Sequence, residues 1–278
     1  MLPNFLVIGG MKCGTSSLWH YLRTHPQVTV ASIKEPGFFV EELNWRRGLS
    51  WYESLFSPNG DGVVAVGEAS TQYTKHPKHP GVPERIARYL PDVRLIYLVR
   101  EPVARMRSHY LHEVTEGYER RPIERALLED DVYLDLSRYA MQIERYVEHF
   151  PPERMLVLPA EDLRERRVET LHRVERFLGI SEDFVPPNID REYNRSEDRK
   201  GFRPSVRAVH DVRPVSALAS RTPAWMKNWT RRFTTRAVPR ERASISDELG
   251  ARLREELAED VSKLRRYVGK DFDGWGIA

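Results

Sequence analysis

The chain has 278 residues, of which 40% are hydrophobic and 31% charged, and its formal net charge is +3. This length is enough for one α/β domain or two small domains, and no apolar run approaches the ~20 residues that a membrane-spanning helix needs. Cys13 is the only cysteine, so an intrachain disulfide and a zinc site built from cysteines are both excluded. We expect a cytoplasmic protein, because a lone cysteine suits a reducing compartment and no basic leader precedes the first apolar run.

Short apolar runs alternate with amphipathic segments along most of the chain. The apolar runs predict strands at 5–9, 28–30, 63–67, 93–99 and 155–158. The amphipathic segments predict helices at 16–23, 83–90, 102–116, 138–149, 168–178 and 248–267. Because this alternation is typical of βαβ units, we predict a single α/β domain, residues 1–278, in which helices flank a central parallel sheet.

A glycine-bracketed loop follows the first predicted strand. Gly9 and Gly14 have the spacing of a phosphate-binding loop, in which backbone N–H groups and a helix N-terminus face an anion. In the Walker A version of this loop the lysine directly precedes the hydroxyl residue. Here Thr15 follows Gly14 directly and the lysine lies inside the loop, at Lys12. The loop therefore predicts an anion site that is not of the P-loop kinase type, although a plain tight turn is the simpler alternative.

A second anion-binding pattern follows the strand predicted at 93–99. Arg100 comes directly after this strand, and Ser108 lies on the helix that Pro102 opens. A guanidinium and a hydroxyl placed in this way can bind one phosphate together. Ligands of parallel α/β sheets bind beyond the carboxyl ends of the strands, so we expect Arg100 and Lys12 at the same edge. The alternative for Arg100 is a surface salt bridge with Glu101 or Asp92.

The two patterns carry a family resemblance. Gly-x-x-Lys-x-Gly-Thr-x-x-Leu, starting at Gly9, resembles the 5′-phosphosulfate loop of sulfotransferases that use 3′-phosphoadenosine 5′-phosphosulfate (PAPS). Arg100-Glu-Pro through Ser108-His-Tyr110 is similar to their 3′-phosphate motif, and the nearest branch is that of the heparan-sulfate N- and 3-O-sulfotransferases and their bacterial relatives. The resemblance implies PAPS as sulfuryl donor, 3′-phosphoadenosine 5′-phosphate (PAP) as product, and no metal. It implies that the residues binding the cofactor are Lys12, Cys13, Gly14, Thr15, Ser16, Ser17, Arg100, Ser108, Arg199, Lys200, Gly201 and Phe202.

The resemblance also implies catalytic roles. Lys12 is expected to stabilise the negative charge that grows on the leaving phosphate. Glu35, in the segment Lys34-Glu35-Pro-Gly-Phe-Phe, is the expected general base, a role that typically contributes about 10²–10⁴-fold. Its alternative is a capping or salt-bridging carboxylate, and Glu68 is then the second candidate for the base on the substrate side. Ala69 stands where the 3-O branch has a lysine, so the acceptor stays open: a hydroxyl, in preference to an amine, of a carbohydrate, lipid or small metabolite.

The segment 206–245 is basic, contains tryptophans and lies outside the resemblance. Ten Lys or Arg residues fall between positions 200 and 240, against the single acid Asp211. Trp225 and Trp229 recur at helical spacing, from which we predict an acceptor-side lid or a peripheral membrane contact through 222–236; a surface helix that packs its tryptophans on the domain is the equal alternative. No nucleic-acid-binding motif accompanies the block, so nucleic acid is not expected as a partner. A nucleotide-binding module without catalysis is disfavoured, because both Lys12 and Glu35 are present.

Overall fold

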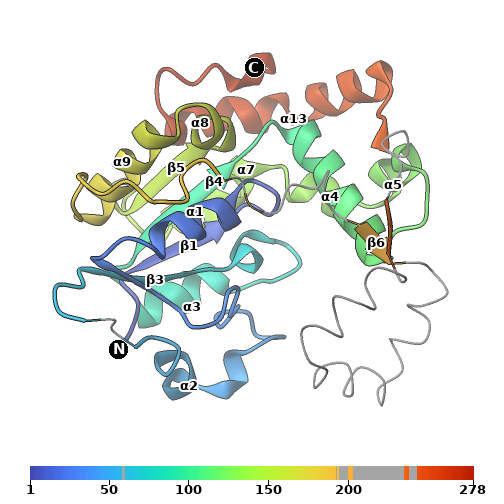
Figure 1. Cartoon of the computed structure of the whole chain (residues 1–278). Coiled ribbons are helices and arrows are strands. Elements are labelled where there is room, and N and C mark those ends of the chain that lie inside the picture. Colours follow the sequence, from blue (N-terminus) through green and yellow to red (C-terminus); the bar gives the residue numbers. More distant parts are fainter. Residues whose placement is uncertain (58–59, 192, 194–199, 203–234, 238–242) are drawn as a thin grey trace.

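The computed structural model describes residues 1–57, 60–191, 193, 200–202, 235–237 and 243–278. Its centre is a five-stranded sheet in the order β2-β3-β1-β4-β5, with all neighbouring strands parallel (Figure 1). This arrangement confirms the predicted single α/β domain with a central parallel sheet. The strands are β1 (Phe5–Gly9), β2 (Val28–Val30), β3 (Ala65–Ala69), β4 (Arg94–Val99) and β5 (Met155–Pro159).

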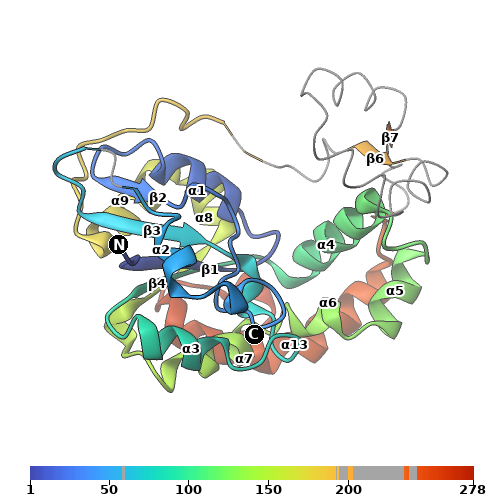
Figure 2. The same cartoon turned by 90° about the horizontal axis from the view of Figure 1, so that it is seen from below.

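Helices cover both faces of the sheet (Figure 2). One face carries α1 (Thr15–Leu22), α8 (Ala160–Glu165) and α9 (Arg167–Leu178), and the other carries α3 (Val82–Tyr89), α7 (Tyr139–Val147) and α13 (Asp247–Val268). α4 (Pro102–Glu116) begins just after β4 and projects beyond the sheet, where it packs against α5 (Ile123–Glu129) and α6 (Val132–Asp135). The shorter elements are α2 (Leu49–Glu53) and the 3₁₀ turns η1 (Trp45–Arg47), η2 (Thr71–Thr74), η3 (Pro152–Arg154) and η6 (Gly274–Gly276).

The core has two parts that share one helix. The larger part surrounds the sheet, whose central strands β1 and β4 are apolar and buried almost throughout, as expected of strands covered on both faces. The smaller part lies under α4, α5 and α6 and includes Met106 and Tyr110. α13 contributes Leu264 to the first part and Leu257 to the second. α13 therefore packs against both the sheet and the projecting helix α4.

β3 differs from its predicted position. It begins at Ala65 and continues to Ala69, whereas the sequence predicted a strand at 63–67 that ended before Glu68. The difference arises because Glu68 and Ala69 stay in register with β1, opposite Leu6 and Val7. Glu68 is therefore a strand residue inside the sheet and not the first residue of a loop.

The order of the strands creates a switch point at β1 and β4. After β1 the chain builds β2 and β3 on one side of it, and then crosses to build β4 and β5 on the other side. The loops that leave the carboxyl ends of β1 and β4 consequently diverge and leave space between them, which is where ligands bind in open α/β sheets. Gly14, in the first of these loops, has a φ of 91°, a left-handed conformation that favours glycine at the start of α1.

Part of the predicted cofactor-closing loop forms a strand beside α4. β6 (Lys200–Phe202) pairs antiparallel with β7 (Thr235–Ala237) and lies next to α4 (Figures 1 and 2). Arg199, Trp225 and Trp229 lie outside the described residues, as does most of the segment 206–245 with the predicted lid or membrane contact. Among the helices that are described, none combines the length and the apolar character needed to span a membrane.

Candidate active site

An open cleft of about 690 Å³ lies where the loops after β1 and β4 diverge. Its walls come from the loop 11–17, the segment that contains Glu35, the turn η2, α4 from Ala104 to Glu113, α8, and the start of α9. Basic side chains outnumber acidic ones in these walls, which suits an anionic ligand. The basic residues are Lys12, Lys34, Lys75, Arg100, Arg107, Arg164 and Arg167, against the acids Glu35 and Glu113.

The loop after β1 delivers the N-terminus of α1 to this cleft. Residues Gly14 to Ser17 line the cleft, and no side chain caps α1. The positive end of the helix dipole therefore faces the space where an anion would bind. Lys12 has a left-handed φ of 70° and lines the same space.

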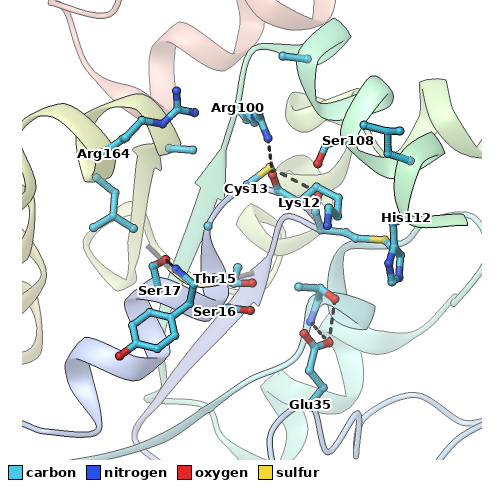
Figure 3. A pocket seen from close by; sticks show the side chains of 18 of the residues that line it. Lys12, Cys13, Thr15, Ser16, Ser17, Glu35, Arg100, Ser108, His112 and Arg164 are labelled. Atoms are coloured by element: carbon cyan, nitrogen blue, oxygen red, sulfur yellow. Dashed lines mark hydrogen bonds between the residues drawn. The ribbon is translucent and has the colours of Figure 1, made fainter. Parts of the chain in front are cut away.

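The two predicted anion motifs are in direct contact (Figure 3). Nη1 of Arg100 donates a hydrogen bond to the backbone oxygen of Lys12 at 3.3 Å, so the end of β4 is tied to the loop after β1. The hydroxyl of Tyr139 donates to the backbone oxygen of Arg100 at 2.7 Å and fixes the start of this turn. Ser108, on α4, lines the same cleft. The pairing of β1 with β4 thus brings together two motifs that are far apart in the sequence.

Glu35 is held from two directions. Its Oε2 accepts hydrogen bonds from the backbone N–H of Thr71 at 3.1 Å and from the Thr71 hydroxyl at 2.8 Å. Its Oε1 lies 3.5 Å from Nζ of Lys34, which also donates to the hydroxyl of Ser16 at 2.7 Å. Lys34 therefore connects the carboxylate to the loop at the N-terminus of α1. The sequence did not single out Lys34 or Thr71 as site residues, although Lys34 directly precedes Glu35.

Glu68 is not brought to the cleft, although the sequence placed it on the substrate side. Its side chain is 1% exposed, and Oε1 accepts hydrogen bonds from the hydroxyls of Tyr52 at 3.2 Å and Tyr73 at 2.5 Å. Burial raises the pKa of Glu68 to about 7. A carboxyl group enclosed in this way has no path to an acceptor hydroxyl, because two tyrosines and the sheet surround it.

Cys13 lines the cleft only through its loop position, because its side chain is fully buried. The thiol lies 3.8 Å from the hydroxyl of Tyr139, and burial raises its pKa to about 11. A thiol that stays protonated is a poor nucleophile. The side chain of Cys13 consequently fills space beneath the loop, and its contribution to a ligand is limited to the backbone.

Several cleft residues were not predicted from the sequence. Lys75 follows η2, and burial lowers its pKa to about 8. His112 lies one helical turn after Ser108 on α4, a spacing that could have drawn attention to it. Arg107 directly precedes Ser108 at a variable position of the second anion motif, and Arg164, Arg167 and Tyr193 belong to no motif. In the part of the chain that the structure describes, no three His, Cys, Asp or Glu side chains are grouped so as to hold a metal ion.

Comparison with known families shows which family this cleft and its two anion motifs belong to. The profile described as "Sulfotransferase domain" matches residues 2–197 of the chain. The chain belongs to the sulfotransferase domain family. This membership confirms the resemblance inferred from the loop at Lys12 and from the Arg100–Ser108 motif, and it places the chain in a family of enzymes.

Similar proteins fall in the branch that the sequence indicated. Human heparan sulfate glucosamine 3-O-sulfotransferase 3B1 is 26% identical over 283 residues, which cover 99% of this chain and 65% of that protein. Human bifunctional heparan sulfate N-deacetylase/N-sulfotransferase 3 is 29% identical over 221 residues, which cover 72% of this chain and 24% of that protein. The chain therefore spans less than two thirds of the length of either relative.

One solved structure shares the fold along the whole chain. The crystal structure of a sulfotransferase from Alicyclobacillus acidocaldarius is 24% identical, with a TM-score of 0.72, and the match covers 99% of both chains. The chain and the Alicyclobacillus acidocaldarius sulfotransferase therefore share one fold.

Proposed function

We propose that this sulfotransferase moves the sulfuryl group of PAPS to an acceptor hydroxyl, in preference to an amine. A carbohydrate is the first candidate for the acceptor, because the two human relatives are named for heparan sulfate. A lipid or a small metabolite with a hydroxyl is the other acceptor class. The observation that carries the proposal is the contact between Arg100 and Lys12, which joins two anion-binding motifs in one basic cleft.

The residues of the cleft fit the two anionic ends of PAPS. The N-terminus of α1 with Lys12 offers donors for the 5′-phosphosulfate, and Lys34 adds a second ammonium group on the same side through its bond to Ser16. Arg100 and Ser108 offer a guanidinium and a hydroxyl for the 3′-phosphate. The cleft volume of about 690 Å³ lies within the usual range for sites that hold a nucleotide-sized molecule.

The chemistry divides between two side chains. When bound, PAPS supplies an activated sulfuryl group and a phosphate leaving group. Lys12 stabilises the negative charge that develops on the leaving oxygen, the kind of electrostatic contribution that is often the largest in catalysis. Glu35 accepts the proton of the acceptor hydroxyl as the new oxygen–sulfur bond forms. Thr71 and Lys34 orient the Glu35 carboxylate, since they hold both of its oxygens.

The test is a transfer assay with radiolabelled PAPS and the purified protein. Acceptors from the carbohydrate, lipid and small-hydroxyl classes are screened in parallel, and the mass of each labelled product identifies the acceptor and the atom modified. We expect transfer to at least one hydroxylated acceptor and saturable binding of PAP. A protein that binds neither PAPS nor PAP would contradict the proposal and would favour a different ligand for the cleft.

A further inference from the structure

The peptide unit between Arg100 and Glu101 is held at both of its polar atoms. Its C=O, on Arg100, accepts the hydrogen bond from the hydroxyl of Tyr139 at 2.7 Å. Its N–H, on Glu101, donates a hydrogen bond to Oε1 of Glu161 at 3.2 Å. Because the side chain of Arg100 lines the cleft, these two bonds fix the backbone from which its guanidinium extends.

Trp275 contacts both of the side chains that hold this peptide unit. Its indole Nε1–H donates a hydrogen bond to Oε2 of Glu161 at 3.2 Å, so one carboxylate joins Trp275 to the N–H of Glu101. The ring of Trp275 also lies against the ring of Tyr139, with 6.1 Å between the centroids and an angle of 53° between the planes. Trp275 therefore supports the turn at Arg100 from two sides, although the two residues are far apart in the sequence.

The backbone of Trp275 is held in an unfavourable conformation. Its φ is 55°, in the left-handed region that bulky side chains rarely adopt. Its backbone N–H donates to Oδ1 of Asp273 at 2.8 Å, and its ring packs edge-on against Phe272 with 4.7 Å between the centroids. Such a conformation persists only where the surrounding structure determines it, and conformations of this kind cluster at functional sites. The segment after α13 thus holds Trp275 where its ring reaches Glu161 and Tyr139.

We propose that Trp275 is a positioning residue for Arg100 and thereby determines how strongly the 3′-phosphate of the cofactor is bound. None of Trp275, Glu161 and Tyr139 lines the cleft, so the effect on the ligand passes through the peptide unit that Glu161 and Tyr139 hold. The proposal rests on the binding of PAPS proposed above, with Arg100 at the 3′-phosphate. It adds a residue outside the cleft to the machinery of that site.

The experiment measures, by titration calorimetry, how much the 3′-phosphate adds to nucleotide binding. PAP and adenosine 5′-monophosphate differ only in that phosphate, so the ratio of their dissociation constants isolates its contribution. We expect Trp275→Ala to lower the preference for PAP at least about tenfold by weakening PAP alone, because a displaced guanidinium loses its charge-assisted hydrogen bonds to phosphate. Trp275→Phe keeps an aromatic ring and removes only the Nε1–H donor, and it should lower the preference about threefold.

A double-mutant cycle tests whether Trp275 acts through Arg100. In Arg100→Ala the guanidinium is already absent, so the further change Trp275→Ala should weaken PAP binding by less than about twofold. Trp51→Ala is the matched control, because Trp51 is also partly buried against the main core and lies outside the cleft wall. The control should lower the melting temperature and leave the preference for PAP unchanged.

Three outcomes would overturn the positioning role and leave Trp275 with core packing alone. They are an equal weakening of both nucleotides, an unchanged preference in both Trp275 variants, and a loss of PAP affinity that is as large without the Arg100 guanidinium as with it. Trp275→Phe, alone and combined with Arg100→Ala, carries the test if Trp275→Ala does not fold. An unmodified protein that binds the two nucleotides equally would instead contradict the proposed function.

Discussion

At the residue scale, Lys12 and Glu35 face the same cleft but are held by different means. Lys12 is positioned by its backbone, whose oxygen accepts the bond from Arg100, whereas the carboxylate of Glu35 is positioned directly by Thr71 and Lys34. A substitution at Lys12 therefore removes one charge and leaves the loop intact. A substitution near Glu35 changes the orientation of the base.

Replacing Lys12 by alanine should lower kcat at least about 10²-fold, because one preorganised donor to developing charge is commonly worth that much. The melting temperature should stay within about 2 °C of the unmodified protein, since a lysine that lines an open cleft adds little to the core. Single-turnover kinetics and calorimetry measure the two quantities. Near-normal turnover in Lys12→Ala would remove this residue from the mechanism.

The Glu35–Thr71 bond offers a graded test of the base. Glu35→Gln should abolish transfer and preserve the affinity for PAP, because the amide cannot take up the proton. Thr71→Val keeps the backbone bond to Oε2 and removes the 2.8 Å hydroxyl bond, so kcat should fall only about tenfold. Activity in Glu35→Gln equal to that of the unmodified protein would mean that another group accepts the proton.

At the element scale, α4 lines both the cleft and a smaller cavity of about 280 Å³ beside it. Ser108 lines the cleft, His109 lines the second cavity, and Glu113 lines both. Glu101 caps the helix by accepting a hydrogen bond from the backbone of Ala104 at 2.5 Å, which holds the start of α4 beside Arg100. One helix thus fixes the distance between the cleft and the cavity.

Removal of the Arg100 guanidinium or of the Ser108 hydroxyl should weaken cofactor binding more than it lowers kcat. We expect Arg100→Ala and Ser108→Ala to raise the dissociation constant of PAP by about tenfold or more, since a charge-assisted hydrogen bond to phosphate contributes about 1.5–3 kcal/mol. Titration calorimetry gives the constants, and Arg88→Ala on α3 is the matched control because Arg88 is exposed and outside the cleft. Unchanged affinity in both variants would rule out the assignment of the 3′-phosphate site.

The site residues that the sequence predicted correctly are those that belong to a short, continuous sequence motif. Lys12, Glu35 and Arg100 each follow a strand in a short motif, so both their position at the sheet edge and their chemistry could be inferred. Lys75 belongs to no motif, and it reaches the cleft only because η2 turns back past the end of β1. Glu68 was misplaced because an acidic residue in a strand interior contradicts strand propensity, and no motif links it to Tyr52 and Tyr73, the two buried tyrosines whose hydrogen bonds stabilise it.

At the scale of the whole molecule, two buried groups oppose each other in the pH dependence of stability. The pKa of Glu68 is raised from 4.5 to about 7, so its contribution to stability is present below pH 4.5 and is lost as the pH rises through about 7. The pKa of His109 is lowered from 6.5 to about 4, so its contribution is present above pH 6.5 and is lost as the pH falls towards 4. Between these limits the two slopes have opposite signs and partly cancel.

Single variants should separate the two slopes. Glu68→Gln should make the free energy of unfolding rise more steeply with pH than in the unmodified protein between pH 4.5 and 6.5, and His109→Gln should tilt it the other way. Urea unfolding at a series of pH values measures both curves. Curves that run parallel to that of the unmodified protein would show that neither group changes its protonation on folding.

The order of the strands also bears on how such an enzyme can be re-targeted. The residues assigned to the donor follow β1 and β4 in the middle of the sheet, whereas Lys75 and Lys78 lie on the connection between β3 and α3. The first part of that connection lies against β1, since the Thr74 hydroxyl donates to the backbone oxygen of Ile8 at 3.0 Å, and it carries Thr71, which holds the Glu35 carboxylate. An exchange that keeps both the base and the Arg100–Lys12 contact is therefore confined to the residues between Lys75 and Val82.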